Sequence, residues 1–61
     1  MKMYDEPEFK KLKKQIHFLK GQLDGIEKML EESKDPNDMF TQTKAVEGGI
    51  QRLIYGLLDN L

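Results

Sequence analysis

The stretch FKKLKKQIHFLKGQLDGIEKML, residues 9–30, carries apolar side chains at alternating steps of three and four. These residues are Phe9, Leu12, Ile16, Leu19, Leu23, Ile26 and Leu30. The spacing is the a/d pattern of a helix that packs along one seam, as in a left-handed coiled coil. The stretch therefore predicts a long amphipathic helix, and no strand pattern, low-complexity segment or internal repeat competes with it.

Capping signals set the limits of two helices. The first helix is expected over about residues 6–33, because Asp5 can cap its N-terminus. The second is expected over about residues 36–60, because Asp35 can cap it and Pro36 fits the first helical position. The second helix continues the same apolar spacing, with Thr43, Val46, Ile50, Leu53 and Leu57.

The short connection predicts an all-α fold in which the chain, residues 1–61, forms a single helical domain shaped as a long antiparallel hairpin. A chain of 61 residues without cysteine buries too little apolar surface to be stable alone. We therefore expect two hairpins to dimerise into a four-helix bundle, and two such dimers to form a tetramer. The expected oligomer core is Leu12, Ile16, Leu19, Leu23, Ile26, Val46, Ile50, Leu53 and Leu57.

Small residues recur four apart in both helices, as Gly21 and Gly25 in the first and as Ala45 and Gly49 in the second. An interior glycine costs a helix roughly 0.5–1 kcal/mol relative to alanine, so a packing role is expected to offset this. We interpret the four residues as sites of close helix packing. The alternative is that Gly48 and Gly49 simply weaken or kink the second helix.

The net charge of −1 conceals a strong asymmetry, because residues 9–23 contain five lysines and no acid, whereas residues 24–38 contain six acids and two lysines. Clustered positive charge is what contact with nucleic-acid phosphates requires. The candidate DNA-binding residues are Lys10, Lys13, Lys14, His17, Lys20 and Lys44. The alternative is a solvated helix face. No helix-turn-helix spacing is present, so readout of the DNA backbone and shape is expected.

Other chemistry is sparse. The only histidine, His17, has no nucleophile near it in the pattern, so we expect no catalytic residue, no enzyme activity and no cofactor. Met1 and Met3, with the terminal amine, are weak candidates for soft metal donors, the alternative being a disordered tail. No apolar run reaches the length of a membrane span and no signal peptide is recognisable, so we expect a cytoplasmic protein without a membrane partner.

The segments KGQLDGIEKMLEE (residues 20–32) and DMFTQTKAV (residues 38–46) resemble the copper-, nickel- and formaldehyde-responsive repressors of the CsoR/RcnR/FrmR family. The similarity covers the chain from about residue 12 to residue 58. It implies an all-helical dimer built as an antiparallel four-helix bundle, usually paired into a tetramer. It also implies binding to double-stranded operator DNA, which the protein releases when it senses its ligand.

The chain departs from this family at the sensor and at some basic positions. The resemblance places the family's sensor cysteine at Pro36 and a sensor histidine at Leu61, with a later cysteine beyond the end of the chain. The family's basic positions fall on Gln15, Phe18 and Glu47. Two functions therefore stay open: a DNA-binding transcriptional regulator without the usual Cys/His ligands and with no metal site, or a helical interaction module that does not bind DNA, such as a paralogue assembling with a full-length family member.

Overall fold

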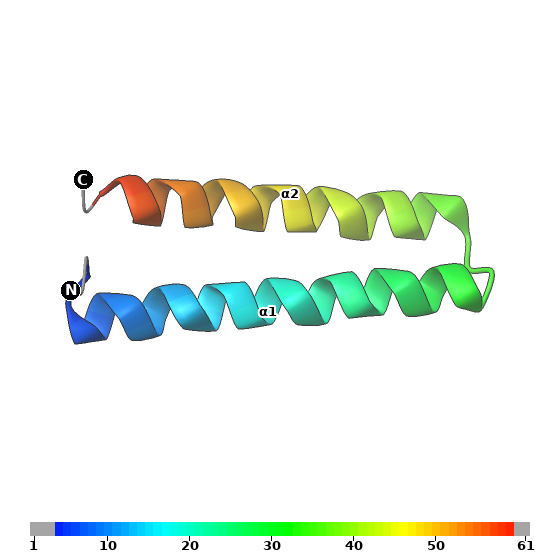
Figure 1. Ribbon diagram of the computed structural model, residues 1–61. Coiled ribbons are helices and arrows are strands. Elements are labelled where there is room, and N and C mark those ends of the chain that lie inside the picture. Colours follow the sequence, from blue (N-terminus) through cyan, green and yellow to red (C-terminus); the bar gives the residue numbers. More distant parts are fainter. Residues whose placement is uncertain (1–3, 60–61) are drawn as a thin grey trace.

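Two antiparallel helices make up the computed structural model, which describes residues 4–59 (Figure 1). Helix α1 spans Glu6–Glu31 and helix α2 spans Pro36–Leu58. They lie side by side as a rod with extents of 45 × 15 × 14 Å. The all-α hairpin predicted from the sequence is confirmed, and residues 4–59 contain no strand.

A tight turn joins the two helices. Helix α1 ends at Glu31, two residues before the expected end, because Ser33 takes a left-handed backbone conformation with φ of 55°. The N–H of Lys34 then donates to the carbonyl of Met29 over 2.9 Å, which satisfies one of the last carbonyls of the helix. The turn therefore starts earlier than the apolar pattern alone predicts.

The two helix starts differ in their capping. The Asp35 carboxylate accepts the N–H of Asn37 at 2.8 Å, so the expected cap of α2 is present. Asp5 occupies the equivalent position before α1, but its side chain makes no capping hydrogen bond. Helix α2 ends at Leu58, and the predicted end at residue 60 lies outside the described residues.

Contact between the helices buries only part of the expected core. Leu12 and Leu19 of α1 are 8% exposed and Val46 of α2 is 4% exposed, and these are the only buried apolar side chains among residues 4–59. Ile26 and Leu53 are half-buried. Five of the nine predicted core residues therefore lie between the helices of a single chain.

The other four predicted core residues, Ile16, Leu23, Ile50 and Leu57, stay exposed in the hairpin. The strip of α1 that faces α2, its seam, is shifted by one residue from the predicted strip. It contains Gln15 and Gln22 in place of Ile16 and Leu23. The side-chain oxygens of both glutamines are buried without a hydrogen-bond partner. A two-helix contact covers only a narrow strip of each helix, which leaves the second half of each apolar pattern uncovered.

We call this uncovered surface the apolar face. Except for Phe9, its residues follow a buried or half-buried residue of the seam by four positions, as Ile16 follows Leu12 and Ile50 follows Val46. Such positions lie on the same side of an antiparallel helix pair, so the exposed apolar residues at these positions of α1 and α2 form one surface. The apolar face consists of Phe9, Ile16, Leu23 and Leu30 of α1 with Ile50 and Leu57 of α2.

The glycines divide differently from the prediction. A methyl group built on Gly49 would lie 2.7 Å from Cδ2 of Leu19, so α1 approaches the backbone of α2 closely there. At Gly21 and Gly25 the same methyl group would meet no atom within 4 Å, and Ala45 is exposed. Within the hairpin only Gly49 of these four residues lies at a close approach of the two helices, because the other three lie beside the seam rather than in it.

This difference predicts opposite effects for two alanine substitutions. Gly21→Ala should raise the free energy of unfolding by about 0.5–1 kcal/mol, because the helix gains propensity and nothing is displaced. The free energy of unfolding of Gly49→Ala should be lower than that of Gly21→Ala by at least about 1 kcal/mol, because the new methyl group pushes against the buried Leu19. Urea titration followed by circular dichroism measures both. Equal stabilisation by the two alanines would contradict the close contact at Gly49.

Candidate nucleic-acid interface

The basic half of α1 is a continuous positive surface. Every lysine in this half is exposed to solvent, and no carboxylate occurs between residues 9 and 23. A shallow hollow of about 500 Å³ is lined by Lys10, Lys13, Lys14, Ile16, His17 and Lys20. The structure thus brings together five of the six predicted DNA-binding residues, because local helical spacing alone places them there.

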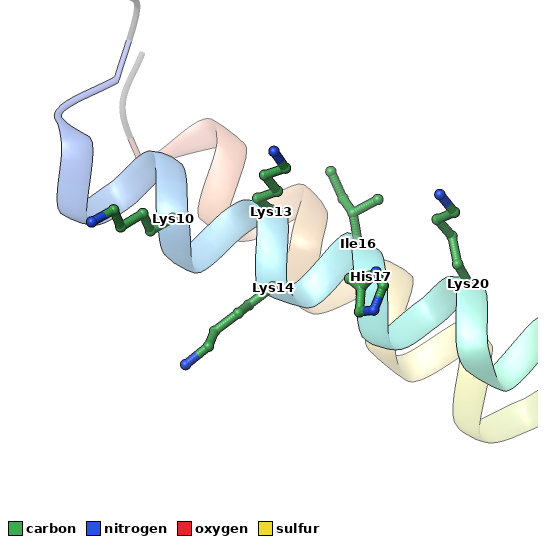
Figure 2. A pocket seen from close by; sticks show the side chains of 6 residues that line it. All are labelled: Lys10, Lys13, Lys14, Ile16, His17 and Lys20. Atoms are coloured by element: carbon green, nitrogen blue, oxygen red, sulfur yellow. The ribbon is translucent and has the colours of Figure 1, made fainter.

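Three of the lysines point to two opposite sides of α1 (Figure 2). Lys13 and Lys20 extend to the same side as Ile16, and therefore border the apolar face. Lys14 extends to the opposite side of the helix. His17 lies between these two groups. The basic surface consequently has one edge beside an apolar surface and one edge that faces away from it.

Weak local contacts orient two of these lysines. The Lys10 ammonium lies 3.8 Å from the Glu6 carboxylate, but both side chains are largely exposed and the pair contributes little. The Lys13 ammonium lies 5.9 Å from the centre of the Phe9 ring, within range of a cation–π contact. Both lysines therefore keep donors available for a phosphate.

Lys44, the sixth predicted DNA-binding residue, lies apart from the others. Its ammonium lies 2.6 Å from the Glu47 carboxylate on the same helix. Leu19 lies opposite Gly49, and Leu12 lies opposite Gly56. A residue of α1 and a residue of α2 are therefore level along the hairpin when their numbers add up to about 68. Lys44 therefore lies level with the acidic half of α1 and does not join the basic surface.

Arg52 on α2 joins that surface and was not among the predicted residues. Its guanidinium nitrogens come within 3.9 Å of a methyl group built on Gly48 and within 3.8 Å of one built on Gly49. Together with Lys14 and His17, Arg52 lines a second hollow of about 450 Å³. It is the only arginine of the chain, and the antiparallel pairing that brings it level with the lysines is the signal that could have identified it.

The arrangement is chemically suited to contact with phosphate groups. Exposed ammonium and guanidinium groups donate charge-assisted hydrogen bonds to phosphate oxygens, and a guanidinium can do so with two parallel bonds. Within residues 4–59 no group of three or more His, Cys, Asp or Glu side chains could hold a metal ion. The suggested donors Met1 and Met3 lie outside the described residues. Within residues 4–59 no helix is long and apolar enough to cross a membrane.

Comparison with known proteins identifies a family. The family model described as metal-sensitive transcriptional repressor matches residues 8–61, which is most of the chain. No curated protein and no solved structure matches the chain.

Proposed function

This chain belongs to the family of metal-sensitive transcriptional repressors, and we propose that it is a transcriptional regulator that binds double-stranded DNA through the basic half of α1 together with Arg52. The observation that carries the proposal is the acid-free segment 9–23, in which every lysine is exposed. The family consists of repressors rather than enzymes, in agreement with the expected lack of catalysis. A cytoplasmic location belongs to the same proposal, since a repressor acts where the DNA is.

Self-association is part of this proposal. A hairpin with three buried apolar side chains among its described residues has too small a core to be stable as a monomer. The apolar face supplies the missing contact area if two copies cover it mutually, which gives a four-helix bundle. Pairing two such dimers would give the tetramer and place several basic surfaces on one particle.

We further propose that this regulator does not sense through a thiol. The 61 residues contain no cysteine. Pro36, where the family resemblance places the sensor cysteine, occupies the first position of α2 and offers no metal-binding or nucleophilic atom. Leu61, at the position of the sensor histidine, lies outside the described residues. Binding of Cu(I), persulfide exchange and reaction with formaldehyde at this position all need the missing sulfur.

A non-DNA-binding interaction module is the second candidate, and the Lys44–Glu47 pair favours it. The Glu47 carboxylate lies 2.6 Å from the Lys44 ammonium, so a negative charge accompanies the one predicted DNA-binding lysine of α2. A chain of this kind could join a full-length family member through the apolar face and alter its response. The measurement of DNA binding separates the two candidates.

The test is titration of a mixed-sequence DNA duplex with the protein at several salt concentrations, with and without Cu(I). A regulator should bind at low salt, and log K should fall linearly with log[salt] with a slope of about −0.9 for each phosphate contacted. Cu(I) should leave the affinity unchanged, because no thiolate is present. Absence of binding at low salt would favour the interaction module, and release of DNA by stoichiometric Cu(I) would contradict the loss of sensing.

A further inference from the structure

The second hollow, on the side of the hairpin that carries Lys14, combines apolar and positive lining residues. Its volume of about 450 Å³ lies within the range of sites that hold small molecules. Phe18, Leu19 and Gly49 line its apolar part. Leu19 is buried, whereas the Phe18 ring is 64% exposed. A small molecule in this hollow would therefore contact a fixed apolar wall and an aromatic ring that is free to pack against it.

Positive groups reach the same hollow from both helices. Lys14 and His17 of α1 line it together with Arg52 of α2, and no acidic residue does so. Among the described residues, neither Lys14 nor Arg52 takes part in an ion pair within the chain. Two permanent positive charges are therefore available to an anion that enters the hollow.

The Arg52 guanidinium lies close to the backbone of α2. Its nitrogens come within 3.9 Å of a methyl group built on Gly48 and within 3.8 Å of one built on Gly49. Because glycine has no side chain, the guanidinium can lie this near to the helix one turn before its own residue. A guanidinium binds a carboxylate through two parallel hydrogen bonds, which a single ammonium group cannot do. Arg52 is thus suited to recognise a planar carboxylate.

We propose that this hollow binds a small aromatic carboxylate, with the carboxylate on Arg52 and Lys14 and the aromatic ring against Phe18. Two aromatic rings pack favourably in offset-stacked or edge-to-face geometry. Lys14 and Arg52 also belong to the proposed DNA-binding surface, so the carboxylate competes with DNA for them. The binding of the carboxylate stands on the hollow alone, whereas the competition rests on the proposed function.

The adjoining hollow fixes the direction of the bound molecule. Its volume is about 560 Å³, and it shares His17 and Phe18 with the first hollow. Beyond Phe18 it is lined by Gly21 and Gly25, and a methyl group built on either glycine meets no atom within 4 Å. This open space has neither lysine nor arginine in its lining. The apolar body of the ligand therefore points past Phe18 toward Gly21, and its carboxylate points toward Arg52.

Two neighbouring hollows lack this combination. The hollow shown in Figure 2 contains four lysines and His17 but a single apolar residue, Ile16, so it suits a compact inorganic anion or a DNA phosphate. The hollow on the other side of Arg52 is lined by Glu8 and Asp59, whose carboxylates repel an anion. A ligand with both an anionic head and an aromatic body is therefore best matched by the hollow at Phe18.

Direct binding is tested with β-naphthoate as the probe, by titrating the full chain and following backbone amide shifts in NMR spectra. The largest shifts are expected at Phe18, Gly48 and Gly49. Two matched compounds separate the contributions: β-naphthamide has the same rings without the charge, and acetate has the charge without the rings. Each should bind at least about tenfold more weakly than naphthoate. Naphthamide or acetate that binds as tightly as naphthoate would overturn the proposed ligand class.

Phe18→Ala should weaken the binding of naphthoate about tenfold, because it removes the ring that packs against the ligand. Phe40→Ala is the matched control, since Phe40 is 66% exposed and lies outside the hollow. It should leave the dissociation constant within about twofold of the wild type. Equal losses in the two variants would overturn the site.

Lys14→Gln is a second variant, which removes one positive charge from the hollow and should weaken the binding of naphthoate about threefold. Lys34→Gln is its control, because it removes the same charge just beyond the acidic half of α1 and should have no effect. Circular dichroism confirms that each variant keeps the helicity of the wild type. Equal naphthoate affinities in Lys14→Gln and Lys34→Gln would overturn the assignment of the carboxylate to Lys14.

Competition with DNA is measured by titrating a duplex at constant ionic strength with naphthoate at about ten times its dissociation constant. The DNA affinity should fall about tenfold, and the same concentration of acetate should have no effect. In Phe18→Ala the ratio of DNA affinities without and with naphthoate should shrink to about twofold. Naphthoate that occupies the hollow without lowering DNA affinity would overturn the competition. A protein that binds naphthoate but no DNA would overturn the proposed function and leave the carboxylate site intact.

Discussion

Ile16→Asp is expected to abolish the helical fold at micromolar concentration, although the side chain it replaces is 45% exposed in the hairpin. The reason is that Ile16 lies at the centre of the apolar face, where the substitution would place a charge between two copies. If most of the stability comes from that contact, a dimer that cannot form leaves an unstable hairpin. Loss of the far-UV helical signal, together with a monomeric sedimentation coefficient, is the measurement.

Phe18→Asp is the matched control for this substitution. Phe18 is 64% exposed, and it lies on the other side of the hairpin, near Arg52. Phe18→Asp removes more exposed apolar surface than Ile16→Asp does. If adding a charge to an exposed position destabilised the protein in general, Phe18→Asp should therefore destabilise it at least as much. We expect this variant to stay folded and self-associated. An Ile16→Asp protein that remains helical as a monomer would show that the hairpin is stable alone and that the apolar face is not required for folding.

The secondary structure could be predicted because its causes are local. Apolar spacing specifies helical segments, and the Asp35 cap with Pro36 specifies where α2 begins. The early end of α1 was not predicted, because a left-handed conformation at Ser33 has no strong signal in a residue other than glycine. Helices and turn thus follow from short-range rules.

The division of the core between two surfaces could not be predicted from one sequence. A 3–4 pattern specifies a stripe of apolar residues, but a stripe that is wide enough can face two neighbours. Which half faces α2 depends on the close approach of Leu19 to Gly49, a contact between residues 30 positions apart. The same dependence explains why Gly21 and Gly25 were assigned to close packing and lie beside the seam instead.

The candidate site shows the same division between local and long-range information. The lysines of α1 share a surface by helical periodicity alone, so the sequence identified them. Lys44 and Arg52 belong to α2, and their positions relative to α1 follow only from the antiparallel pairing. That pairing takes Lys44 to the acidic half of α1, where Glu47 binds it, and brings Arg52 beside Lys14.

The double variant Lys14→Glu/Arg52→Glu is expected to lose detectable DNA binding at salt concentrations where the wild type binds. These two side chains come from different helices and line the same hollow on the side away from the apolar face. Reversing both charges replaces attraction to the DNA phosphates by repulsion. This happens in every copy of the oligomer, so the losses of DNA affinity multiply. The salt dependence should also become shallower by about 0.9 in slope for each phosphate contact removed. Gel-shift or anisotropy titration over a salt series measures both effects.

The control is Lys28→Glu/Lys34→Glu, which changes the net charge by the same amount in and just beyond the acidic half of α1. If DNA follows the basic surface, this control should weaken binding only slightly, through the general charge of the particle. Both double variants should keep the helicity and sedimentation of the wild type, since all four side chains lie outside the apolar face. Equal losses in the two variants would mean that net charge alone governs binding, and would remove the assignment of the contact to Lys14 and Arg52.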